Sequence, residues 1–181
     1  MKRNVIICGL IAGLIVTALM LAAMAKINSL DHYAGSLVVG YTSMLVAFSL
    51  IFVAIKNSRD KYRNGMITFG KAFRIGLVIT LIASTMYVLV WMIDFYYFIP
   101  DYYQKYAAHQ LSAMKAAGAT PAQLAAKAAE TQKFGEMYKN PFFNALFTYL
   151  EILPVGLVVS VLAALILKRK PSAADNVVIT N

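Results

Sequence analysis

The chain has 181 residues, of which 60% are hydrophobic and 14% are charged, and its formal net charge is +9. So few charged residues exclude an ordinary soluble domain, in which about a quarter of the residues are charged. The basic residues flank apolar runs instead of forming one stripe, so they indicate membrane topology and no nucleic-acid partner.

Four segments are long and apolar enough to cross a hydrocarbon core of about 30 Å, which takes roughly 20 helical residues. They cover residues 5–25, 37–55, 72–93 and 147–167. Lipid offers no partners for backbone amides, so each segment must be a helix. The sequence therefore predicts an all-α integral membrane protein: a four-helix transmembrane bundle in one domain of residues 1–170, followed by a cytoplasmic tail at 171–181.

The first apolar run has two features that allow more than one interpretation. Its basic start and the small residues Ala23 and Ala25 near its end resemble a signal peptide, but the run exceeds the usual core of about 7 to 15 residues, so we expect it to be retained. Gly9 and Gly13 belong to stripes of small residues that recur at every fourth position in spans one, three and four. We interpret the stripes as packing within the bundle, with a dimer interface at Gly9 and Gly13 as the alternative.

The segment after the second span is dense in cations, which are Lys56, Arg59, Lys61 and Arg63. Together with the N-terminal tail, residues 71–74 and residues 168–170, it holds 11 of the 17 basic residues. Cytoplasmic flanks carry such an excess, so both termini are predicted to lie on the cytoplasmic side of the membrane. The same four cations are candidate contacts for anionic lipids.

Residues 94–141 form the sizeable segment outside the spans, and their pattern predicts a helical hairpin between spans three and four, on the side of the membrane opposite the termini. A stretch without helix breakers at 101–117 ends at Gly118, a residue typical of helix C-termini. Thr120, Pro121 and Gln123 then combine an N-cap, a proline at the first helical position and a capping-box partner. Aromatic residues crowd both ends of the hairpin, as in an outer aromatic belt.

Glu151 is the acid within the fourth span, and such a carboxyl group is by default a candidate functional site. Pro154 follows three residues later and should loosen the helix there. We interpret Glu151 as structural, held by hydrogen bonds at a kink. The alternative is a proton or cation site in a small transport-type protein, with Tyr41, Thr80 and Ser84 as its other polar groups.

The sequence contains no motif that indicates an enzyme. The sequence has no nucleophile elbow, glycine-rich phosphate loop or zinc-protease motif. His32 and His109 lack the spacing of metal ligands, and a single cysteine, Cys8, cannot build a thiolate site. We expect no catalytic activity, cofactor or metal, and interpret the chain as a structural or interaction module. Its partners would be the lipid bilayer and either a second copy or another membrane protein.

Several local strings resemble a bacterial family called domain of unknown function 4199. They are GYTSM at 40–44, FSLIFV at 48–53, FGKAF at 69–73, MYKNP at 137–141, EILPVGL at 151–157 and LKRK at 167–170. The resemblance extends over nearly the whole chain and implies a four-span protein of the bacterial inner membrane. It implies no activity and no catalytic or binding residue.

Overall fold

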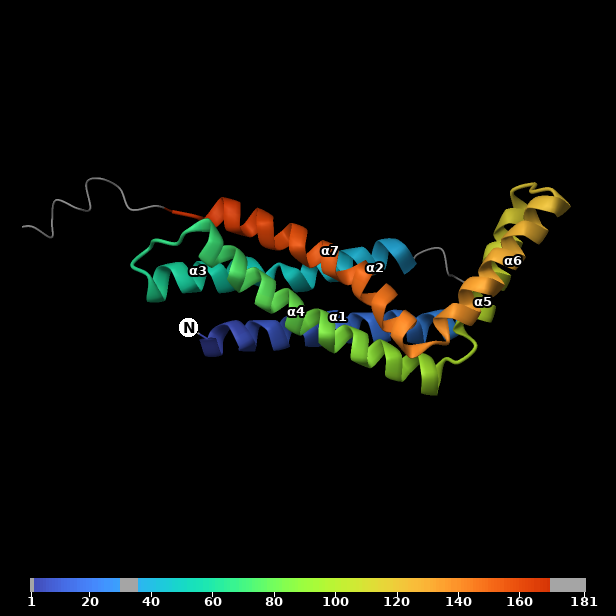
Figure 1. Cartoon of the computed structure of the whole chain (residues 1–181), viewed down its shortest axis with the longest axis horizontal. Coiled ribbons are helices and arrows are strands. Elements are labelled where there is room, and N and C mark those ends of the chain that lie inside the picture. The colour runs from blue at the N-terminus through green and yellow to red at the C-terminus, as the bar shows by residue number, and fades with distance from the viewer. Residues whose placement is uncertain (1, 30–35, 170–181) are drawn as a thin grey trace, which may run out of the picture.

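The computed structural model describes residues 2–29 and 36–169, and it is helical through nearly all of them (Figure 1). Long helices run lengthwise beside one another, and a pair of shorter helices projects from one end (Figure 1). Predictions made for His32, Lys170 and the tail at 171–181 fall outside the described residues.

The described helices occur in the order that the sequence predicts. They are α1 (Lys2–Ser29), α2 (Ser36–Phe48), α3 (Leu50–Tyr62), α4 (Phe69–Ile93), the π-helical turn η2 (Asp94–Phe98), α5 (Tyr102–Ala116), α6 (Pro121–Tyr138) and α7 (Pro141–Leu167). Four stretches are long and apolar enough to cross a membrane: Lys2–Ala25, Val38–Tyr62, Phe69–Phe98 and Pro141–Leu167. This confirms an all-α chain with four helical stretches of membrane-spanning length.

The helices extend beyond the apolar runs that predicted them. The second run ends at residue 55, yet α3 continues to Tyr62 because no helix breaker intervenes. Asn64 and Gly65 then adopt positive φ angles of 49° and 78°, which turn the chain toward α4. Ser49 separates α2 from α3, and its hydroxyl donates to the Val46 carbonyl over 2.6 Å.

Glycines allow α4 to pack closely against α1 and α7. A Cβ atom at Gly9 or Gly13 would lie against the side chains of Ile82 and Met86 on α4. A Cβ atom at Gly76 would lie 2.6 Å from Ser160 Oγ on α7. The stripes of small residues therefore pack within the chain, as predicted, and each span gains van der Waals contact at these points.

Large apolar side chains cover much of the outer surface of the bundle. Val38, Ile166 and Leu14 are 74%, 67% and 60% exposed. A soluble monomer rarely exposes contiguous apolar area on this scale, whereas lipid tails solvate it without penalty. The surface has the character of a multi-pass membrane protein.

The hairpin of α5 and α6 follows the capping signals of the sequence. Gly118 has a φ of 83° after α5, and the Thr120 side chain accepts from the Gln123 backbone N–H while Gln123 Oε1 accepts from the Thr120 backbone N–H. Asn140 then caps α7, because its Oδ1 atom accepts from the Phe142 N–H over 3.0 Å. The chain therefore returns directly from the hairpin into the fourth span.

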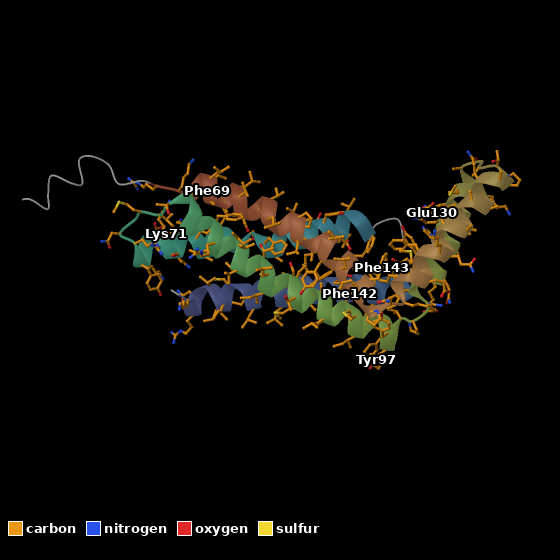
Figure 2. All side chains as sticks on the ribbon, viewed as in Figure 1. Phe69, Lys71, Tyr97, Glu130, Phe142 and Phe143 are labelled. Atoms are coloured by element: carbon orange, nitrogen blue, oxygen red, sulfur yellow. The ribbon has the colours of Figure 1, made fainter. Side chains whose placement is uncertain are left out.

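The hairpin lies at one end of the bundle, and the described ends of the chain lie at the other (Figure 1). Tyr97, Phe142 and Phe143 lie at the hairpin end, whereas Phe69 and Lys71 lie at the opposite end, which also holds the start of α1 (Figures 1 and 2). At this second end the backbones of Ile67 and Arg169 exchange two hydrogen bonds of 3.1 and 2.9 Å. The described ends of the chain thus lie at the same end of the bundle, away from the hairpin.

Candidate functional site

A cavity of about 650 Å³ lies where the hairpin meets the bundle. Its lining comes from residues 16–24 of α1, 39–43 of α2, 87–91 of α4, 102–110 of α5, 127–138 of α6 and 148–151 of α7. The volume is in the range of small-molecule sites in proteins. Six helices contribute to its wall, so the cavity depends on the packing of the hairpin against the spans.

The cavity is confined to the hairpin half of the molecule. None of its lining residues comes from the segment between Ser43 and Tyr87 or from beyond Glu151. The adjoining part of the bundle is filled by side chains that have no exposed surface, including Phe48, Ile51 and Ile79. The cavity therefore ends within the bundle in this structure.

Glu151 and Tyr41 are the two sequence-predicted site residues that line the cavity. Glu151 lies on α7 three residues after Thr148, so both side chains share one helix face. Its carboxylate accepts no hydrogen bond and forms no ion pair with any side chain that the structure describes. Glu151 is thus an acid aimed at a cavity and without a described partner.

Thr80 and Ser84 lie deeper in the bundle and do not line the cavity. Ser160 Oγ donates to the Gly156 carbonyl over 2.7 Å, so the 3.2 Å contact between Thr80 and Ser160 has Thr80 as its donor. Ser84 is fully buried, and its hydroxyl has no partner among the described residues. Thr80 joins α4 to α7, and neither residue meets Glu151 in a common site.

A directed series of hydrogen bonds fixes one wall of the cavity. The Trp91 indole N–H donates to Tyr138 Oη over 3.0 Å, and Thr148 Oγ1 donates to the Asn144 carbonyl over 2.8 Å. Tyr138 must therefore donate its hydroxyl proton in the 3.1 Å contact with Thr148 Oγ1. The series connects α4, α6 and α7, so it fixes the hairpin on the two spans.

Tyrosines of the hairpin remain neutral in this wall. Burial raises the pKa of Tyr138, although its hydrogen bonds with Thr148 and Trp91 oppose that rise. Burial likewise raises the pKa of Tyr103, whose ring centroid lies 4.7 Å from that of Tyr138. At neutral pH both phenols therefore keep the protons that they can donate.

Charged groups of α6 lie on the hairpin side of the cavity. Lys127 Nζ lies 3.1 Å from Glu130 Oε2, and both residues are among the lining side chains. Figure 2 places Glu130 on the projecting hairpin. This pair balances its own charge, which leaves Glu151 as the one unbalanced carboxylate among the lining residues that the structure describes.

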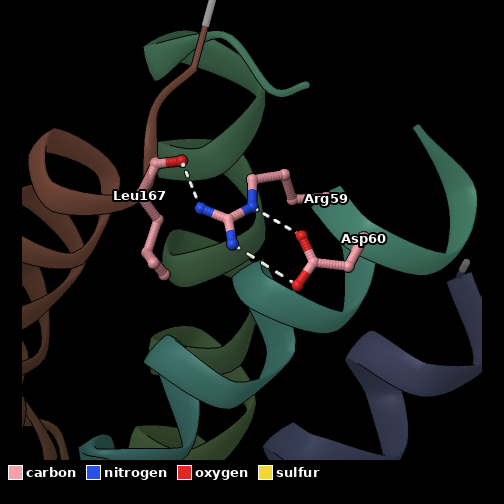
Figure 3. Close-up of polar contacts among 3 residues, drawn as sticks. All are labelled: Arg59, Asp60 and Leu167. Atoms are coloured by element: carbon pink, nitrogen blue, oxygen red, sulfur yellow. Dashed lines mark hydrogen bonds and ion pairs between the residues drawn. The ribbon is translucent and has the colours of Figure 1, made fainter. Parts of the chain in front are cut away.

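The predicted lipid-contacting cations lie at the end of the bundle opposite the cavity. Arg59 is engaged there: its Nε atom lies 2.7 Å from Asp60 Oδ1, and its Nη1 atom donates to the Leu167 carbonyl over 3.5 Å (Figure 3). Lys56 and Lys61 are exposed. Arg59 thus caps the C-terminus of α7, while these two lysines keep exposed charge.

Tyr87, Trp91, Glu130 and Tyr138 also line the cavity, and no local sequence pattern joins them into one site. Trp91 and Tyr138 are hydrogen-bonded partners although their positions differ by 47. The available signal was the position of Tyr138 at the end of a helix that precedes a span. In the part of the chain that the structure describes, no three His, Cys, Asp or Glu side chains are grouped to hold a metal ion.

Comparison with known proteins identifies one family. A family model described as protein of unknown function (DUF4199) matches residues 7–169. This range includes the first membrane-length stretch from residue 7 onward, the other three stretches, the hairpin and every described cavity-lining residue. No curated protein and no solved structure matches the chain significantly.

Proposed function

The chain belongs to this family of proteins of unknown function, and we propose that it is a non-catalytic interaction module of a bacterial inner membrane that binds a ligand in the cavity. The observation that carries the proposal is the cavity itself, whose wall combines apolar and aromatic side chains with hydroxyl, amide and charged groups. Ligand sites in proteins have this composition and size.

The proposed orientation places the hairpin in the periplasm and both termini in the cytoplasm. Its support is the charge bias, since the end opposite the hairpin holds the cationic segment 56–63 and residues 168–169. The exposed aromatic residues Tyr97 and Phe142 would then lie near the outer headgroups. A ligand would reach the cavity from the periplasm or from the outer leaflet.

A transport-type function is the second candidate, because Glu151 lines a cavity at one end of the bundle. The close packing in the other half of the bundle argues against transport, because Phe48, Ile51 and Ile79 have no exposed surface there. A transport path would require these side chains to separate. Binding requires no such rearrangement, so we place it first.

Native mass spectrometry of the protein in nanodiscs formed directly from its own membranes tests the binding function. Gly40 lines the cavity, and a Cβ atom there would meet no atom within 4 Å, so Gly40→Phe adds a ring to free space. Gly70→Phe is the matched control, because Gly70 is equally unobstructed but lies at the other end of α4 from the cavity.

We expect a discrete bound mass on the wild type and on Gly70→Phe, and its loss from Gly40→Phe. A bound mass that survives Gly40→Phe would place the ligand outside the cavity. A protein that carries no discrete bound mass in any variant would contradict the binding function.

A further inference from the structure

We propose that the ligand is an amphipathic organic cation, with its charge against the Glu151 carboxylate and its apolar part among the aromatic and methionine side chains of the cavity. This inference rests on the proposed binding function and specifies its ligand class.

The charge of the cavity wall selects a cation. Lys127 and Glu130 form a pair across 3.1 Å and cancel one another. Glu151 has no described partner, so the net charge of the Lys, Arg, Asp and Glu side chains among the described lining residues is negative. A compensating group stabilises an ionised carboxylate in the membrane region, and a bound cation supplies one.

The uncharged part of the wall selects an apolar body. Side chains of Met20, Met24, Tyr87 and Trp91 line the spans' side of the cavity, and Tyr103 and Phe134 line the hairpin side. Aromatic faces attract cations, and methionine adapts to irregular apolar ligands. A hydrophilic cation would leave these surfaces without contact, whereas an anion of the same size would be repelled by Glu151.

Trp91 provides the readout, because it is the one tryptophan in the chain and it lines the cavity. The probes are tetraphenylphosphonium and tetraphenylborate, which have nearly the same size and shape but opposite charge. Each is titrated into the full-length protein in dodecyl maltoside, and Trp91 fluorescence is recorded. The variants are Glu151→Gln, Gly40→Phe and the control Gly70→Phe, none of which adds a tryptophan.

We expect saturable quenching by tetraphenylphosphonium, a Kd at least tenfold higher in Glu151→Gln, and no saturation with tetraphenylborate. Equal affinity for the two ions, or a Kd that Glu151→Gln leaves unchanged, overturns the cation proposal. If Gly40→Phe alone removes binding in that case, the cavity still binds ligands and the proposed function stands. If neither ion saturates, the cation proposal also fails, and the native bound mass decides the proposed function.

A lipid ammonium headgroup and a free amphipathic cation share this chemistry, and added lipid distinguishes them. Phosphatidylethanolamine should raise the apparent Kd of tetraphenylphosphonium if the lipid ammonium occupies the cavity. Phosphatidylglycerol, which carries no ammonium group, is the control. An unchanged Kd with both lipids would indicate a free cation.

Discussion

Trp91 on α4 donates its indole N–H to the phenol oxygen of Tyr138 at the end of α6, so a residue of the third span holds the hairpin in place. Tyr138 is 7% exposed and is also bonded to Thr148. The two bonds make the cavity wall a continuous structure from α4 through α6 to α7.

Replacing Tyr138 by phenylalanine should therefore destabilise the protein. The change leaves the indole donor of Trp91 without its acceptor, and a buried unsatisfied group costs about 1 to 3 kcal/mol. We expect an earlier thermal transition of Trp91 fluorescence in detergent. Tyr97→Phe is the control, because the Tyr97 side chain is 80% exposed. Equal melting of the two variants would contradict a structural role for the bond.

Close packing between α4 and α7 predicts a different effect at Gly76. A Cβ atom there would lie 2.7 Å from Ser160 Cβ and 3.1 Å from Ser160 Cα, so the α7 backbone itself would have to shift. Overpacking of this kind costs about 1 to 3 kcal/mol, and Gly76→Ala should melt earlier than the wild type. Gly70→Ala on the same helix meets no atom within 4 Å and should melt no earlier. The comparison is made by thermal aggregation of membrane extracts in detergent.

The proposed orientation predicts which thiols a membrane-impermeant reagent reaches in intact cells. With Cys8→Ser as the background, Ala119→Cys in the hairpin turn should be labelled from outside. Lys61→Cys at the end of α3 should be labelled only after lysis. The reverse pattern would place the hairpin in the cytoplasm and contradict the charge-based topology.

The sequence predicts the helices better than the site, for physical reasons. Residue spacing and capping are local, so the Thr120 capping box and the positions of α5 and α6 follow from a few adjacent side chains. Hydropathy identifies the apolar part of a span but not the end of its helix. For this reason α3 continues beyond residue 55 and ends at Tyr62, shortly before the turn at Asn64. The cavity is a gap among six helices, and no local pattern records such a gap.

Glu151 shows the same division between local and long-range information. Its membrane position could be recognised from the sequence, but its neighbours depend on how α1, α2 and the hairpin pack around α7. The structure places it with Tyr41 and without Thr80 or Ser84, because those two side chains are fully buried within the packed bundle and do not line the cavity. A polar residue in a span is thus identified by sequence, whereas its role depends on the cavity.

The stability of Glu151 variants distinguishes a binding role from a structural one. Because the carboxylate has no hydrogen bond or ion pair with a described side chain, replacing it removes no described polar interaction. An uncharged side chain also avoids the cost of placing a carboxylate within a membrane span. We therefore expect Glu151→Leu and Glu151→Gln to melt at or above the wild-type temperature in detergent without ligand.

The same melting experiment in the presence of tetraphenylphosphonium should reverse this order. A ligand that binds only the folded state raises the free energy of unfolding by RT ln(1 + [L]/Kd), which is about 2.7 kcal/mol at a ligand concentration of 100 Kd. The wild type should gain stability from the cation, and both variants should gain less at equal concentration. If Glu151→Leu instead melts well below the wild type and Glu151→Gln does not, hydrogen bonds at the Pro154 turn hold the side chain, and Glu151 is structural.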